Sequence, residues 1–188
     1  ETAREIGNVA ASRIAATVAI LARTELGLPV VAGRYVRHVE TAIKGATSVS
    51  LHLPLMVEAL LSIGEWKRAE SVIEQAEHHT GGRLRAALWT AARAELLRHD
   101  VRRLDDAARD AERALALAEE IDSRSTVATA LLTTAQISRL AGNHARATAQ
   151  LEHARELFAK LGNVHQCRRA DALLADLALD AVAEQPAM

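Results

Sequence analysis

Apolar residues recur every three or four positions along most of this chain, the spacing of one face of an α-helix. Between the turn signals, the recurring apolar positions form three clear stripes: Ala147, Leu151, Ala154, Phe158 and Leu161; Cys167, Ala170, Leu174, Leu177 and Ala181; and Trp66, Ala69, Ile73 and Ala76. The pattern predicts an all-α protein, with no strands and with helices at residues 9–26, 30–44, 51–63, 65–79, 83–99, 103–121, 124–141, 143–161 and 164–183.

Glycines and asparagines mark where these helices end and begin. Gly-Asn pairs occur at residues 7–8, 142–143 and 162–163. A glycine just past a helix end takes the left-handed conformation at little cost, and the following asparagine can cap the next helix. Asn163 and Gln166 also have the spacing of a capping box. Asp122-Ser123 stands where another such glycine is expected. Pro54 must either lie in the first turn of its helix or kink the helix.

The breaks fall into two interleaved series, each repeating at roughly 36–41 residues, within the range of helical-hairpin repeats. Two series of breaks mean two helices in each unit. We therefore expect one repeat domain over residues 1–188, with units at 9–45, 46–82, 83–122 and 123–162 and a final helix at 164–183. Residues 1–7 look like the end of an earlier helix, so we expect the chain to be a fragment of a larger protein.

Small residues follow the turn glycines at fixed spacing and resemble the tetratricopeptide pattern. Alanines stand five and twelve positions after Gly64 and Gly142, and Ala107 and Ala114 stand at the same places in the third unit, which has His99-Asp100 instead of the glycine. Trp89 matches the early aromatic position of the pattern. The resemblance implies a right-handed α-α superhelix, a TPR-like solenoid, of about four helical hairpins plus a C-terminal helix.

Two segments, residues 114–121 and 151–164, resemble the helical arms of large bacterial signalling proteins. These are LuxR-type regulators with a signalling ATPase core and class III adenylate cyclases. The resemblance implies a non-catalytic scaffold, the sensor or docking arm of a transcriptional or signalling regulator, that binds a protein or peptide segment or a small-molecule inducer. The alternative is an accessory or oligomerisation arm of an enzyme such as a nucleotide cyclase or an ATPase. Exposed ends of such an array also allow homodimerisation.

Composition and net charge reduce the classes of partner that the chain is expected to bind. The net charge is −1, with Lys+Arg 23 against Asp+Glu 24, so the chain lacks the basic excess of nucleic-acid binders. Aromatic residues make up only 2% of the chain, too few for base stacking. No run of about 18 uncharged apolar residues is present, which argues against a membrane span. Cys167 is the single cysteine. We therefore expect a cytoplasmic location with no membrane or direct nucleic-acid contact.

No arrangement of residues predicts catalysis or a bound cofactor. The chain has neither a P-loop nor a Gly-x-Gly-x-x-Gly sequence. His78 and His79 are adjacent and point in different directions on a helix, so they do not form a zinc pair. His165 and Cys167 also lie on different faces, and Cys167 is expected in the core. We expect no enzyme activity, no metal and no cofactor.

Two sets of polar residues are candidates for binding. The first is a basic stretch followed by acidic residues. It is interpreted either as solvated helix faces with ion pairs or as a site for an anionic partner. Its residues are Arg83, Arg85, Arg93, Arg98, Arg102, Arg103, Asp105, Asp106 and Asp110. The second follows from projecting the tetratricopeptide pattern, which implies a concave groove lined by Thr17, Thr24, Glu58, Thr90, Arg98, Gln136 and Arg139. We further expect Asp171, Asp176 and Asp180 to keep the outer face of the last helix solvated.

Overall fold

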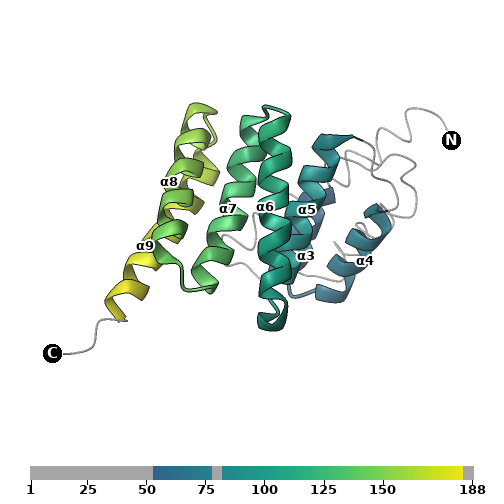
Figure 1. Cartoon of the computed structure of the whole chain (residues 1–188), viewed down its shortest axis with the longest axis horizontal. Helices are drawn as coiled ribbons and strands as arrows, with labels where there is room; N and C mark the ends of the chain where they lie inside the picture. The colour runs from purple at the N-terminus through teal and green to yellow at the C-terminus, as the bar shows by residue number, and fades with distance from the viewer. Residues whose placement is uncertain (1–52, 78–81, 184–188) are drawn as a thin grey trace. The chain divides into compact units, whose positions relative to one another are not determined.

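The computed structural model of the chain describes residues 53–77 and 82–183, which Figure 1 shows as helices joined by turns. The predicted helices at 9–26 and 30–44, and the pair His78-His79, lie outside the described residues. The chain divides into two compact units, residues 1–80 and 81–188. Their boundary falls between residues 80 and 81, two residues before the predicted junction of two repeat units.

The first unit contributes two described helices, α3 (Leu53–Ser62) and α4 (Trp66–Glu77), which pack against each other. Pro54 is the second residue of α3, where the helix needs no backbone N–H from it, so the helix begins without a kink. Gly64 joins the two helices with φ of +77°. Ala69 and Ile73 of the predicted stripe are buried, whereas Trp66 at its start is 41% exposed.

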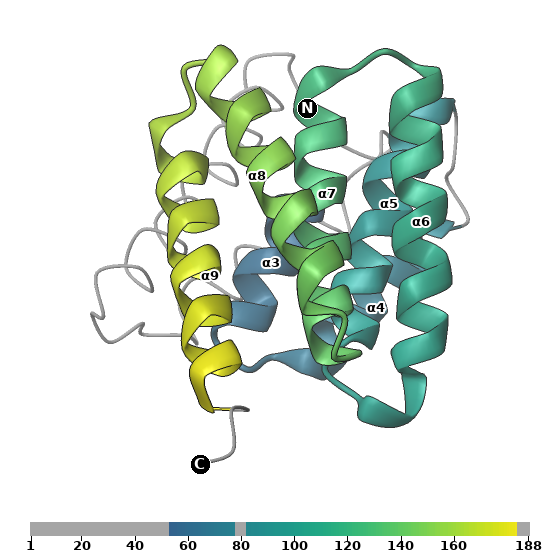
Figure 2. The same cartoon turned by 60° about the vertical axis from the view of Figure 1, so that its left-hand side comes forward.

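The second unit contains α5 (Arg83–Leu97), the short 3₁₀ helix η1 (Val101–Arg103), α6 (Leu104–Glu120), α7 (Arg124–Leu140), α8 (His144–Lys160) and α9 (Val164–Ala183). Each of these α-helices packs chiefly against its neighbour in the chain, and α5 also contacts α7 (Figures 1 and 2). The described residues contain no strand, so the all-α prediction is confirmed for them.

The same turn ends four of the helices. At Gly64, Asp122, Gly142 and Gly162 the backbone takes a positive φ, and the amide of each donates to the carbonyl three residues back. The next residue's amide donates to the carbonyl five residues back, as in the bond of 2.8 Å from Asn143 to Ser138. This pair of bonds is the Schellman motif, which satisfies carbonyls that a helix end leaves open. Asp122 therefore occupies the glycine position, as the sequence predicts.

Asparagine caps begin the last two helices. The side chain of Asn143 accepts from the amide of Arg146, and that of Asn163 accepts from the amide of Gln166, both at 3.2 Å. The capping box predicted at the second position is only half formed, because the amide of Asn163 donates to the carbonyl of Phe158 and not to Gln166. The Schellman bond has taken the donor that the glutamine would have used.

Alanines form the buried face of α6. Ala107, Ala111, Ala114 and Ala118 are completely buried, and Ala114 packs in one cluster with Ala91 of α5 and Ala130 of α7. Because these side chains are so small, the helices can approach closely. A second cluster joins α7, α8 and α9 through larger residues, among them Leu131, Leu151, Phe158 and Leu177.

The predicted stripes largely match these clusters. In α8 Ala147, Leu151, Ala154 and Phe158 are buried, but Leu161 is 46% exposed because it caps the helix end. Cys167 is half-buried and packs against the cluster of α7, α8 and α9, in line with the core position expected for it. Among the described residues no helix is both long and apolar enough to cross a lipid bilayer.

Candidate functional site

One open cavity of about 710 Å³ lies in the second unit, and we call it the α5/α7/α9 pocket. Its wall comes from the end of α5, the last turn of α7, the start of α8 and the inner side of α9: Arg98, Gln136, Arg139, Leu140, Gly142, His144, Leu173 and Asp180. The pocket exists because the Gly142 turn reverses the chain between α7 and α8, and α9 then returns past the end of α7.

Arg139 connects α7 to α9 at the edge of this pocket. Its Nε donates to Oδ2 of Asp180 at 2.7 Å, and its Nη1 donates to Oδ2 of Asp176 at 3.4 Å. The two aspartates are four residues apart and therefore lie on one face of α9. The hydrogen bond to Asp180 and the charges of Asp180 and Asp176 raise the pKa of Arg139 above its usual value, although desolvation of the guanidinium acts in the opposite direction. The guanidinium is therefore cationic at every relevant pH.

A second ion pair holds Arg98. Its Nη2 donates to Oε1 of Glu95 one turn earlier, and the two side chains are only 17% and 14% exposed. Burial by itself would raise the pKa of Glu95, but the bond from Arg98 and the charges of Arg98, Arg169 and His99 outweigh it, so the pKa lies below its usual value. Burial, together with the charge of Arg98, lowers the pKa of His99.

The predicted groove residues separate into three groups. Thr17 and Thr24 lie outside the described residues. Glu58 is half-buried on α3 in the first unit, and Thr90 on α5 is outside the pocket wall, with its hydroxyl donating to the carbonyl of Ala86 at 2.7 Å. Arg98, Gln136 and Arg139 line the same pocket. Their role in binding stays a prediction.

The sequence interpretation missed Leu140, His144, Leu173 and Asp180 as pocket residues. The acids of α9 are solvated as predicted, with the side chains of Asp171, Asp176 and Asp180 51%, 55% and 37% exposed, but they do not lie on the outer face. Asp176 and Asp180 pair with Arg139 of α7, and Asp171 pairs with Arg155 of α8 at 2.5 Å, so all three face preceding helices. The outer side of α9 instead exposes Leu179, at 68%. The i, i+4 spacing of Asp176 and Asp180 places both carboxylates on one face of α9, but it does not tell which helix that face meets.

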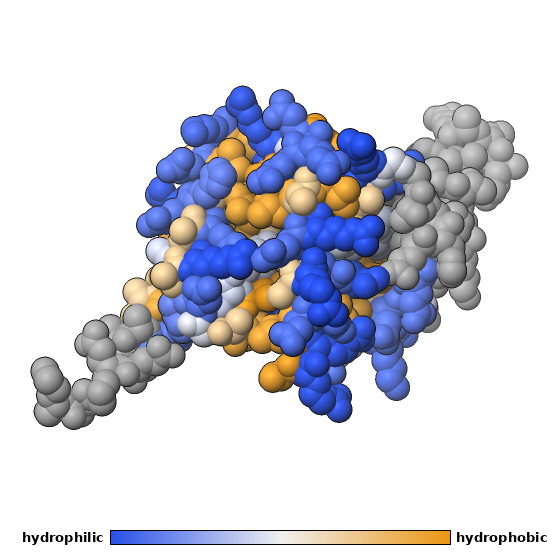
Figure 3. All heavy atoms as spheres, in the orientation of Figure 1, coloured by the Kyte–Doolittle hydropathy of each residue, from blue (hydrophilic) through white to orange (hydrophobic). Residues whose placement is uncertain are grey.

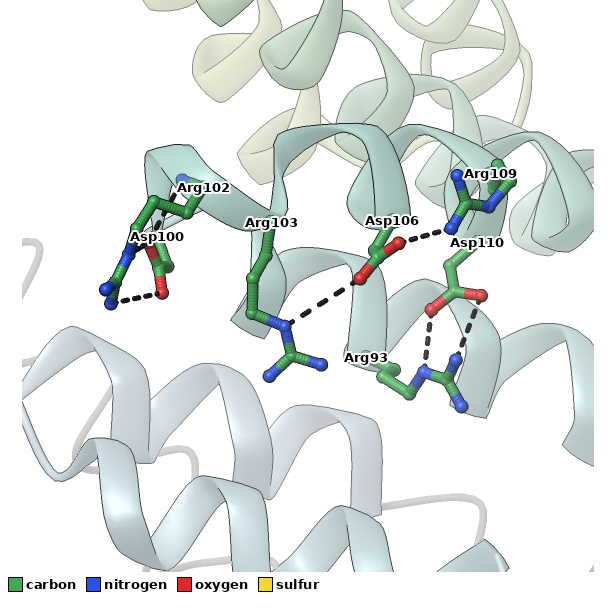
Figure 4. A network of polar contacts seen from close by, with 7 residues as sticks. All are labelled: Arg93, Asp100, Arg102, Arg103, Asp106, Arg109 and Asp110. Atoms are coloured by element: carbon green, nitrogen blue, oxygen red, sulfur yellow. Dashed lines mark hydrogen bonds and ion pairs between the residues drawn. The ribbon is translucent and has the colours of Figure 1, made fainter.

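The basic stretch of the third unit forms ion pairs within the unit (Figure 4). Nε of Arg93 donates to Asp110 at 2.7 Å across α5 and α6, while Asp106 lies between Arg103 and Arg109. Asp100 accepts hydrogen bonds from the guanidinium and from the backbone amide of Arg102, and these bonds lower the pKa of its carboxyl. These contacts support the interpretation as a solvated face with ion pairs, except at Arg98, which is only 17% exposed and lines the pocket.

The face in Figure 3 is mostly hydrophilic, with apolar patches between the charged side chains. Within the described residues, no group of three or more His, Cys, Asp or Glu side chains is arranged to hold a metal ion.

No protein-family model matches this chain, and no curated protein was found to be significantly similar to it.

Proposed function

We propose that this chain is a non-catalytic, TPR-like binding scaffold, the sensor or docking arm of a bacterial signalling or transcriptional regulator. The observation that carries the proposal is the convergence of side chains from α5, α7 and α9 on one open pocket. Helices packed in chain order expose one side of every second helix to a common surface. A protein segment or a small-molecule inducer bound there would contact several helices at once.

Two features support the TPR-like arrangement behind this proposal. The Schellman turn recurs at Gly64, Asp122, Gly142 and Gly162. Alanines at the positions that the tetratricopeptide pattern reserves for small residues are completely buried: Ala69, Ala107, Ala114, Ala147 and Ala154. Small buried residues there allow the two helices of a hairpin to approach closely, and a right-handed superhelix is the arrangement that such hairpins build.

The proposal is tested by expressing variants with substitutions in the pocket in the source organism and measuring the transcript profile. Leu140→Asp introduces a charge into the pocket, and Leu161→Asp is the matched control, because both leucines are exposed beside a Gly-Asn turn and only Leu140 lines the pocket. We expect the transcript profile of the source organism to change with Leu140→Asp and to stay unchanged with Leu161→Asp. Identical profiles for the two variants and the parent would contradict a regulatory role.

A further inference from the structure

The arginines of the α5/α7/α9 pocket carry more hydrogen-bond donors than their carboxylate partners use. A guanidinium has five N–H groups. Arg139 donates two of them, to Asp176 and Asp180, and Arg98 donates to Glu95. Nε of Arg98 is buried without a hydrogen-bond partner. Gln136 adds an amide whose Nε2 makes only a long bond of 3.4 Å, to the carbonyl of Leu132.

Two leucines give the same pocket an apolar side. Leu140 is 53% exposed although it is a large aliphatic residue, and Leu173 is half-buried on the facing helix. Water contact with such a side chain is unfavourable, so covering Leu140 with an apolar group would contribute to binding. The volume of about 710 Å³ lies within the range of small-molecule sites.

From this combination we propose that the α5/α7/α9 pocket binds a small organic anion. The oxyanion group accepts from the guanidiniums of Arg98 and Arg139, and a short aliphatic body covers Leu140 and Leu173. The inference rests on the proposed scaffold function and specifies its ligand. A carboxylate and a phosphate monoester share this chemistry, since both offer several acceptor oxygens to paired N–H donors.

Asp180 allows a prediction of whether a substitution strengthens or weakens anion binding. Its carboxylate lines the pocket and holds Arg139, so it repels an incoming anion and competes with it for the same donors. Removing that charge should strengthen anion binding. A variant that merely damages the fold would weaken it.

The test is an NMR titration of the full ¹⁵N-labelled chain with hexanoate, hexyl phosphate and hexanol. We expect saturable shifts of the amides around Arg139 and Leu140 with one or both anions, and at least about tenfold weaker binding of hexanol. The anion that binds more tightly identifies the oxyanion class. The proposal is overturned if neither anion gives saturable shifts there by about 10 mM, or if hexanol binds equally well.

Four variants complete the experiment. Asp180→Asn should raise the anion affinity about three- to tenfold, and Leu140→Asp should lower it by at least as much. Asp171→Asn and Leu161→Asp are the controls, because Asp171 pairs with Arg155 away from the pocket wall and Leu161 is exposed beside the next Gly-Asn turn. Controls that change the affinity as much as the pocket variants would contradict the assignment.

The cellular and the NMR experiments can fail separately. A changed transcript profile without anion binding refutes only the ligand proposed here. Saturable anion binding with an unchanged profile supports this pocket and refutes the regulatory role.

Discussion

At the scale of single residues, backbone conformation explains where the helices end. Asp122 has φ of +51°, a backbone conformation that residues other than glycine adopt at a cost in free energy. Gly142 has φ of +72° at the equivalent position of another turn of the same type. A Cβ at Gly142 would meet nothing within 4 Å, so a substitution there acts through the backbone alone.

Exchanging residues at these two turns should therefore change stability in opposite directions. Gly142→Ala should lower the free energy of unfolding by about 1 kcal/mol, and Asp122→Gly should raise it by about 0.5–1 kcal/mol. Urea denaturation at pH 7 measures both. Changes of the same sign in the two variants would refute the equivalence of the turns.

The buried pair of Glu95 and Arg98 makes stability depend on pH. Because the pKa of Glu95 is lower in the folded chain than in the unfolded chain, its ionised form stabilises the fold above the unfolded pKa of about 4.3. That contribution is lost as the pH falls through the folded pKa. Acidification should therefore abolish whatever the pair contributes.

Glu95→Gln should lower the free energy of unfolding at pH 7 by about 2–3 kcal/mol, since it leaves Arg98 largely buried without its counter-charge. The difference from the parent chain should shrink below about pH 4. Denaturation curves between pH 3 and pH 7 check this, with Glu120→Gln in the exposed pair with Arg83 as a control expected to change little. A difference that stays constant with pH would contradict the assignment.

At the scale of elements, the alanine face of α6 sets how closely α5, α6 and α7 approach. Ala114 is completely buried against Ala91 and Ala130, whereas Ala116 on the same helix is exposed. Ala114→Leu should destabilise the protein by about 1–3 kcal/mol or more through overpacking. Ala116→Leu should change stability by less than about 0.5 kcal/mol. Thermal unfolding followed by circular dichroism distinguishes the two, and equal effects would mean that the helices are not closely packed.

The sequence predicts the described helices well because their ends carry chemical signals. The helices predicted at 124–141 and 143–161 occur as Arg124–Leu140 and His144–Lys160, with Gly142 and Asn143 between them. The turn after α5 has neither signal. There Asp100 caps the short helix η1 by accepting from the amide of Arg102, and the sequence pattern does not predict η1.

At the scale of the whole molecule, only part of the candidate site could be predicted from the resemblance to the tetratricopeptide pattern. Gln136 and Arg139 are implied by the tetratricopeptide pattern, and because they are three residues apart they lie on one face of α7. Asp180 could not be assigned, because its place depends on how α9 crosses the end of α7, a tertiary contact that no local pattern encodes. For the same reason the sequence does not predict that these solvent-exposed acids of α9 pair with arginines of the preceding helices.

The central claim is that α5 to α9 pack in chain order, and this order brings α5, α7 and α9 around one pocket. The most direct test is a methyl NOESY spectrum of the chain with labelled alanine, leucine, isoleucine and valine methyl groups. The packing predicts cross-peaks from Ala114 to Ala91 and to Ala130, and cross-peaks joining α7 and α8 through Leu131 and Leu151. Missing Ala114 cross-peaks, together with cross-peaks between the methyl groups of α6 and α9, would contradict it.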